Sequence, residues 1–177
     1  MLNKKIINPL TNQQQTAVIK ATDLCIKNSE RKFGQQFSLV TVDFDLWGKC
    51  AGMYQVRGSK RRIRFNPWIF SKYYDESISN TVVHEVAHYL VDCIWGIRHV
   101  KPHGKEWKNT MLALGVEPIV RGNYDLTGIP QKIYQRFDYR CDCKVHHLTT
   151  LRHRKITEQG AIYRCQACHS NLRSGSS

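Results

Sequence analysis

The chain has 177 residues, of which 41% are hydrophobic, enough for one ordinary domain with a small appendage. No run of about 18 apolar residues occurs and the N-terminus lacks the apolar segment of a secretory signal, so we expect a cytoplasmic protein without membrane contact. The formal net charge of +13 favours a polyanion, DNA or another nucleic acid, as a partner.

The first predicted element is a packing helix over residues 13–32. Ala17, Ala21 and Leu24 recur there at helical spacing. Gly34 follows and is expected to end the helix.

Three short strands are predicted next. Residues 37–44 alternate in the manner of a strand, and residues 53–56 and 61–65 follow, joined through Gly58-Ser59. Asn66-Pro67 is expected to stop this run. We therefore expect a small antiparallel sheet.

Residues 79–95 are predicted to form the central helix, with Ser79 or Asn80 as its N-cap and Gly96 at its end. Apolar residues occupy much of its circumference, so the helix should be largely buried. A second helix is predicted over about residues 104–114.

The central helix carries the pattern H-E-x-x-H, with His84, Glu85 and His88. Residues four apart on a helix lie on the same side, about 6 Å apart along the axis, so two imidazoles can bind one metal ion. Glu85 projects beside them and can reach a water molecule without being a ligand. Two buried histidines that are satisfied by hydrogen bonds are the alternative. The pattern favours a zinc-dependent peptidase in which Glu85 is the catalytic base.

A catalytic zinc ion usually has three protein ligands and one open position. The third ligand should come from the element that follows the central helix. His103 is the preferred candidate because Gly104 beside it permits a close backbone approach. Glu106 and His99 are the alternatives.

Beyond Pro130 the remaining segment is short, basic and rich in cysteine. Cys141/Cys143 and Cys165/Cys168 form two pairs about 21 residues apart, a spacing typical of a zinc ribbon. Cys141-x-Cys143 is one residue shorter than the usual pair, so His146 remains an alternative ligand. A C-terminal region that binds no metal is a further alternative. We expect a second, structural zinc ion.

The same C-terminal region has a strong positive charge. Residues 130–177 contain nine lysine and arginine residues against three acidic ones. Arg152, Arg154 and Lys155 belong to its densest basic run, which we expect on a hairpin, and are candidates for contact with nucleic-acid phosphates. A solvated charged turn is the alternative.

These motifs together resemble the SprT family, the bacterial relatives of the Spartan-type proteases. The resemblance rests on Val82-Val83-His84-Glu85-Val86-Ala87-His88-Tyr89, on His103-Gly104-Lys105-Glu106-Trp107-Lys108, on Ala51-Gly52 leading to Ile63-Arg64-Phe65-Asn66-Pro67, and on Tyr163-Arg164-Cys165-Gln166-Ala167-Cys168. It covers roughly residues 12 to 173.

The resemblance implies an α+β fold with a compact zincin (minigluzincin-like) core over residues 12–130. It implies a zinc-ribbon-like basic module over residues 131–173, and we expect a disordered tail over residues 174–177. It also implies His84, His88 and His103 as zinc ligands and Glu85 as the catalytic residue. Spartan-type relatives cleave proteins crosslinked to DNA, and that substrate belongs to the relatives.

The sequence thus predicts a zinc metallopeptidase, an endopeptidase whose candidate substrates are DNA-associated proteins. The alternative is a zinc-stabilised nucleic-acid-binding or regulatory protein with weak or no peptidase activity. Glu85 distinguishes the two hypotheses, because a purely structural zinc site has no use for an adjacent carboxylate base.

Overall fold

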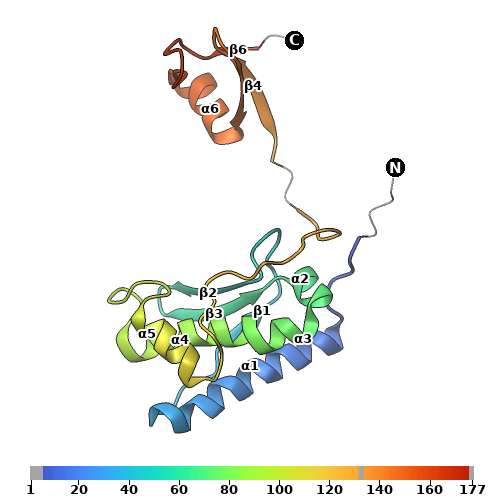
Figure 1. Ribbon diagram of the computed structural model, residues 1–177, viewed down its shortest axis with the longest axis vertical. Helices are drawn as coiled ribbons and strands as arrows, with labels where there is room; N and C mark the ends of the chain where they lie inside the picture. Colours follow the sequence, from blue (N-terminus) through green and yellow to red (C-terminus); the bar gives the residue numbers. More distant parts are fainter. Residues whose placement is uncertain (1–5, 132–133, 176–177) are drawn as a thin grey trace. The chain divides into compact units, whose positions relative to one another are not determined.

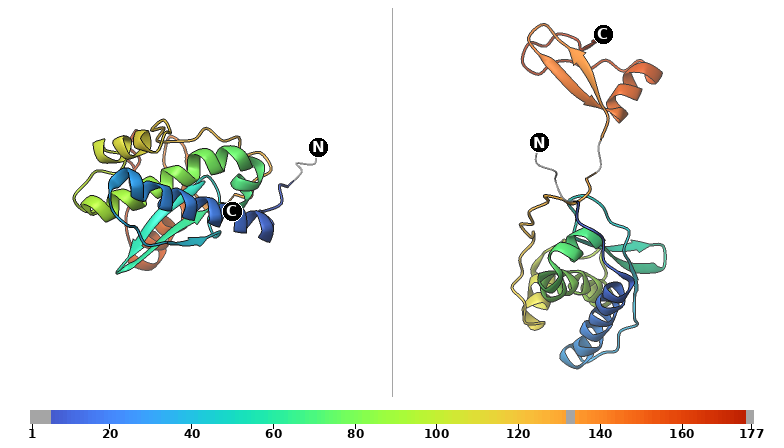
Figure 2. Two further views of the ribbon diagram at one scale, coloured as in Figure 1. Left: turned by 90° about the horizontal axis from the view of Figure 1, so that it is seen from below. Right: turned by 90° about the vertical axis from the view of Figure 1, so that its right-hand side faces the viewer.

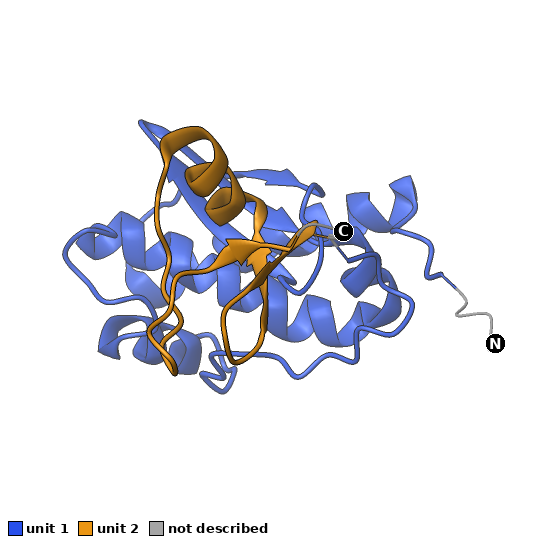
Figure 3. Ribbon diagram, turned by 90° about the horizontal axis from the view of Figure 1, so that it is seen from above, with its two compact units in different colours: residues 1–131 blue, residues 132–177 orange. Residues whose placement is uncertain are grey.

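The structure is a computed structural model that describes residues 6–131 and 134–175. The chain forms two compact units, unit 1 over residues 1–131 and unit 2 over residues 132–177 (Figure 3). Unit 1 combines several helices with a small sheet and unit 2 combines one helix with another, so the fold is of the mixed α+β class. Among the described residues, no helix combines the length and apolar character needed to cross a bilayer.

Unit 1 begins with helix α1 (Asn12–Phe33), close to the predicted range. Its N-terminus is closed by a capping box, in which Thr11 accepts from the amide of Gln14 and the Gln14 side chain accepts from the amide of Thr11. Gly34 has a φ of 65° and ends the helix in the left-handed conformation that glycine adopts without strain.

The sheet of unit 1 contains β1 (Thr41–Asp43), β2 (Gly52–Arg57) and β3 (Lys60–Phe65), in the order β1-β3-β2. The prediction of an antiparallel sheet is wrong in part: β2 and β3 form an antiparallel hairpin, but β1 pairs with β3 in parallel. Strands that follow one another in the sequence are often neighbours in the sheet. Instead β3 lies between the other two strands, which leaves β2 at the edge of the sheet.

Asn66-Pro67 starts a helix and does not merely stop a strand. The Asn66 side chain accepts hydrogen bonds from the amides of Trp68 and Ile69, and proline is well suited to the first helical position. The chain is then helical in pieces up to Trp95, so neither Ser79 nor Asn80 is an N-cap. The pieces are α2 (Pro67–Lys72), α3 (Tyr74–Glu76), the π-helical segment η1 (Ser77–Val82) and α4 (Val83–Trp95).

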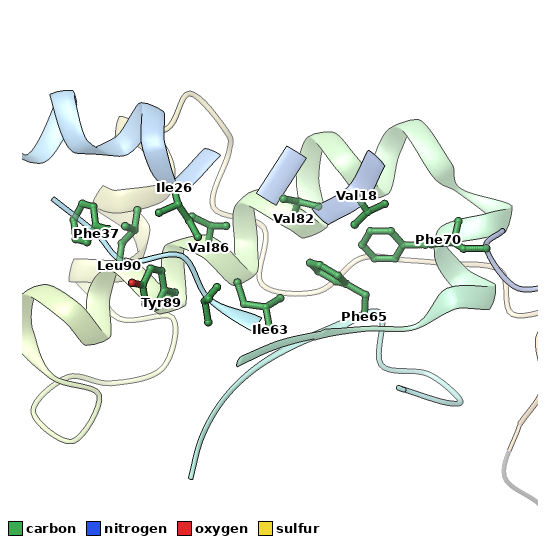
Figure 4. Packing of buried hydrophobic residues seen from close by; sticks show 12 residues of the cluster. Val18, Ile26, Phe37, Ile63, Phe65, Phe70, Val82, Val86, Tyr89 and Leu90 are labelled. Carbon is green, nitrogen blue, oxygen red and sulfur yellow. The ribbon is translucent and has the colours of Figure 1, made fainter. Parts of the chain in front are cut away.

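The core of unit 1 lies between the sheet and the two helices α1 and α4, which cover the same face of it (Figures 1 and 2). Ile26 of α1 lies next to Val86 of α4, and Val18 of α1 and Ile63 of β3 belong to the same buried layer (Figure 4). All four side chains are fully buried. The helix that carries the H-E-x-x-H pattern is therefore ordered by apolar packing along its length.

A second cluster packs on the other side of α4. Helix α5 (Lys105–Ala113) supplies Trp107 and Met111, both 1% exposed, against Ala87 and Val91. This contact fixes the start of α5 next to the middle of α4.

Unit 2 is a three-stranded sheet of order β5-β4-β6 with one helix beside it (Figure 2). Among its described residues, only Tyr139, Leu148 and Cys165 are buried hydrophobic side chains. Its elements are β4 (Arg136–Arg140), β5 (Val145–Thr149), α6 (Thr150–Gln159) and β6 (Arg173–Ser174).

Two predictions for unit 2 need correction. The basic run with Arg152, Arg154 and Lys155 lies on helix α6, not on a hairpin, because Thr149 caps a helix there and Gly160 ends it. The predicted disordered tail does not begin at Ser174, which pairs with Tyr139 in the sheet. The remaining tail residues 176–177, and residues 132–133 of the predicted module, lie outside the described residues.

Candidate metal centres

Three imidazoles converge in unit 1. His84 and His88 lie one turn apart on α4, and His103 approaches from the loop before α5. The Nε2 atoms are 3.3 Å apart for His84 and His88, 3.1 Å for His84 and His103, and 3.0 Å for His88 and His103. His103 has a φ of 55°, a conformation that is uncommon outside glycine and that turns its ring toward α4.

This spacing fits a zinc ion. Zinc–nitrogen bonds of about 2.0–2.1 Å in a tetrahedral site place the ligand nitrogens about 3.3 Å apart. The three observed separations are at or slightly below that value, so one ion can bind all three nitrogens and keep its fourth position open.

The protonation of the histidines supports the same conclusion. Burial is the main cause that lowers the pKa of His84 to about 4 and that of His88 to about 3, and the neighbouring imidazoles contribute to both shifts. Burial also lowers the pKa of His103. All three rings are therefore neutral at pH 7, the form in which an imidazole binds a metal ion.

Trp107 forms the floor of this histidine site. Its ring lies edge-on to His84 and His103 and stacks on His88, with centroids 4.6–5.5 Å away. Its indole Nε1 donates to the carbonyl of His84 at 3.4 Å. The buried indole thus restricts the three rings to the orientations in which their nitrogens meet.

Glu85 lies next to the histidine site and is 5% exposed. Its Oε2 accepts a hydrogen bond of 2.7 Å from the amide of Tyr54 on β2. Burial raises the pKa of Glu85 to about 8, and the bond from Tyr54 acts in the opposite direction. A cation bound nearby favours the ionised carboxylate, the form that can accept a proton.

Gly52 makes room for this carboxylate. A Cβ atom at Gly52 would lie 2.7 Å from Cγ and Oε1 of Glu85 and 2.9 Å from Cγ2 of Thr81. No side chain fits there without displacing Glu85. Gly52 is the first residue of β2 and not part of a turn, and a glycine inside a strand can indicate such a close approach.

A cleft of about 640 Å³ opens beside these residues. His84 and Glu85 form part of its wall, and Met111, Ile119, Arg121 and Tyr124 are among the other lining residues. The cleft therefore joins a candidate metal site, a carboxylate and apolar surface in one accessible space. This combination is typical of an active site.

The structure also separates the alternatives for the third ligand. Among the described residues of unit 1, the group of potential ligand atoms within 4.8 Å of one another consists of His84, His88 and His103. Neither Glu106 nor His99 belongs to it. His103 is therefore the residue that the fold brings to the pair on α4.

Four cysteines converge in unit 2. The sulfur atoms of Cys141, Cys143, Cys165 and Cys168 belong to one group whose ligand atoms all lie within 4.8 Å. Sγ of Cys143 is 3.4 Å from Sγ of Cys141 and 3.7 Å from Sγ of Cys165. Zinc–sulfur bonds of about 2.3 Å place sulfurs about 3.8 Å apart, so the group is compatible with zinc and consistent with a zinc-ribbon-like module.

His146 is outside this group of four. Its Nε2 lies 3.2 Å from Sγ of Cys141, at hydrogen-bond distance from a sulfur that can itself bind the ion. Hydrogen bonds from the Ser170 hydroxyl and amide lower the pKa of Cys168 to about 6, which favours its thiolate. The geometry thus favours the four-cysteine set over the set that contains His146.

Comparisons with known proteins identify the family of the chain. Residues 22–135 match the model of the SprT-like family. Protein SprT of Vibrio parahaemolyticus is 32% identical over 149 residues, which are 84% of this chain and 86% of the relative. Protein SprT of Klebsiella pneumoniae is 35% identical over 155 residues, 87% of this chain and 89% of the relative. The chain therefore belongs to the SprT-like family.

Proposed function

We propose that this protein is a zinc-dependent endopeptidase with a zincin-type core. The observation that supports this most strongly is the convergence of three neutral imidazoles, with nitrogens 3.0–3.3 Å apart, next to the buried carboxylate of Glu85. Three protein ligands with an open fourth position are the arrangement of catalytic zinc sites, whereas structural sites have all four positions filled by the protein.

Each part of the site has a chemical role in the proposal. His84, His88 and His103 would hold the zinc ion, which would supply a Lewis acid able to lower the pKa of water and to polarise a carbonyl group. Glu85 accepts a proton from the attacking water and delivers it to the leaving amine. Burial of Glu85 strengthens its electrostatic interactions during this transfer.

Two tyrosines are candidates for stabilising the oxyanion, and their surroundings differ. The hydroxyl of Tyr89 donates to the carbonyl of Ser38 at 2.6 Å, and Tyr89 does not line the cleft. The hydroxyl of Tyr124 lies within the cleft wall, 2.9 Å from Oγ1 of Thr81. Tyr124, with Arg121 beside it, is therefore the better candidate for contact with a bound peptide.

We further propose that nucleic acid brings substrates to the enzyme. Arg152, Arg154 and Lys155 are all exposed on α6. The first candidates for substrates are accordingly proteins bound to DNA. A nucleic-acid-binding protein without peptidase activity remains the competing function.

The test is a cleavage assay on unfolded casein, with and without DNA, combined with zinc analysis. We expect Glu85→Gln to retain zinc and to lose activity by roughly 10²- to 10⁴-fold. His103→Ala should lose one equivalent of zinc together with its activity. Equal cleavage by the wild type and Glu85→Gln would contradict the assignment of Glu85 and favour the competing function.

A further inference from the structure

Tyr54 joins the edge strand β2 to helix α4 at two points. Its backbone amide donates to Oε2 of Glu85 at 2.7 Å, and its phenolic hydroxyl donates to Oδ2 of Asp92 at 2.7 Å. One residue of the sheet thus contacts both the candidate catalytic carboxylate and a second carboxylate on the same helix.

The periodicity of the helix explains why this is geometrically natural. Glu85 and Asp92 are seven residues apart, which is about two turns and about 10 Å along the axis, so both side chains lie on the same face of α4. Tyr54 pairs with Ile63 of β3, and because β2 is an edge strand its outward amide is available to Glu85. The tyrosine ring extends along the helix to the second carboxylate.

Asp92 is held more firmly than a surface carboxylate. It is 7% exposed and accepts hydrogen bonds from Tyr54, from Nε of Arg61 at 2.7 Å and from the amide of Ile97 at 2.8 Å. Burial alone would raise its pKa, but the hydrogen bonds from Arg61, Tyr54 and Ile97 outweigh burial and lower it. Asp92 is therefore an ionised, fully bonded anchor.

The location of this anchor is otherwise unfavourable. Asp92 lies in the last turn of α4, where the helix dipole disfavours a negative charge. Arg61 of β3 compensates for that charge, although the Arg61 side chain is 43% exposed and its contribution is reduced by solvent. Asp92 nevertheless links the end of α4 to the sheet through its bonds with Tyr54 and Arg61.

We propose that Tyr54 and Asp92, supported by Arg61, are positioning residues for Glu85. The bond between the phenol of Tyr54 and Asp92 holds β2 against α4, and this fixes the amide that orients the carboxylate of Glu85. The inference rests on the proposed role of Glu85 as the proton acceptor. A misplacement of about 1 Å at a catalytic group can reduce the rate roughly 100-fold.

The kinetic test compares Tyr54→Phe and Asp92→Asn with the wild type on casein. We expect kcat to fall roughly 10- to 100-fold in both variants, with KM unchanged within about twofold and the zinc content unchanged. A variant that merely loosens the fold would lose zinc or raise KM as well. Wild-type kcat in both variants would overturn the proposal.

Neighbouring arginines on β3 supply a matched control. Arg61→Gln removes a partner of Asp92, whereas Arg62→Gln removes bonds to Asp43 and Gln55 within the sheet. We expect kcat to fall in Arg61→Gln, to recover in part in Arg61→Lys and to stay at the wild-type value in Arg62→Gln. Equal losses in Arg61→Gln and Arg62→Gln would show a general effect of the sheet and overturn the proposal.

A second measurement does not depend on peptidase activity. In zinc-loaded, ¹⁵N-labelled protein, the amide proton of residue 54 should shift in Glu85→Gln, because its acceptor changes. Its hydrogen exchange should become roughly tenfold faster or more in Asp92→Asn, because the anchor of β2 is weakened. Unchanged exchange would overturn the proposal. If the wild type and Glu85→Gln cleaved casein equally, the proposed function would fail. The exchange measurement would still show whether the bond between Tyr54 and Asp92 holds β2 against α4.

Discussion

Two of the three histidines in unit 1, His84 and His88, are presented by a helix that apolar packing already orders, whereas the cysteines of unit 2 surround a small sheet with few buried side chains. Val86, Ala87 and Leu90 of α4 are each 0% exposed, so the backbone between His84 and His88 is fixed without help from a metal ion. In unit 2 the buried hydrophobic side chains among the described residues are Tyr139, Leu148 and Cys165.

The two sites should therefore depend on metal in different ways. Small domains below about 40 residues usually need a metal ion, disulfides or a partner to fold. Unit 2 is close to that limit, and its cysteines are free thiols. We expect metal to complete a site in unit 1 and to hold the fold together in unit 2.

The largest expected effect comes from removing the metal of unit 2. Cys165→Ser should abolish zinc binding there and unfold the unit, because the binding energy of a structural zinc ion, about 10–16 kcal/mol in small zinc domains, is also its folding energy. The measurement is an ¹⁵N NMR spectrum, in which resonances of residues 134–175 should collapse to random-coil positions. Resonances of unit 1 should stay dispersed.

His103→Ala is the matched variant in unit 1. It should also release one zinc ion, but the resonances of α1 and of the sheet should stay dispersed. Unfolding of unit 1 in His103→Ala, or a folded unit 2 in Cys165→Ser, would show that the two units do not differ in their need for metal.

A smaller effect is expected from one added methyl group in unit 1. Gly52→Ala must displace Glu85 or Thr81, because the new Cβ would lie 2.7–2.9 Å from their atoms. Overpacking of this kind costs about 1–3 kcal/mol in the free energy of unfolding. Since two of the three closest atoms belong to Glu85, we also expect kcat on casein to fall while zinc remains bound.

Gly115→Ala separates lost stability from lost activity. Gly115 has a φ of 84°, and nothing lies within 4 Å of an added Cβ atom, so the substitution costs backbone strain of about 1–2 kcal/mol without touching the site. The two variants are compared by thermal unfolding and by kcat. Equal kcat values in both would show that Glu85 tolerates the displacement.

Local patterns in the sequence identified the parts of the site that one helix supplies. The spacing of His84, Glu85 and His88 needs only helical periodicity, and the packing of α4 follows from its apolar residues. His103 was reached by reasoning about the next element, and the structure brings it to the pair. The family was recognised from the same motifs, and the comparisons confirm it.

The sequence did not reveal contacts between distant segments. Tyr54 meets Glu85 across 31 positions and Asp92 across 38, and neither distance follows from periodicity. The order of the strands was missed for the same reason, because the parallel pairing of β1 with β3 depends on where the chain returns. Helix α6 was not predicted because it is rich in charged residues and has no strong apolar face, although Thr149 and Gly160 are recognisable caps.

The smallest expected effect concerns the basic residues of α6 and the binding of DNA. Arg152 and Lys155 lie three residues apart on α6 and share a face, whereas Arg154 lies 3.8 Å from Glu158. Replacing Arg152 and Lys155 by glutamine should weaken binding to double-stranded DNA and reduce the slope of log K against log salt by about 1–2. The measurement is fluorescence anisotropy of labelled DNA at several salt concentrations.

Because Arg154 is already near a carboxylate, Arg154→Gln should change the slope less. If the double variant kept the wild-type slope, the basic helix would not be the surface that meets phosphate, and the charge of unit 1 would have to account for any binding.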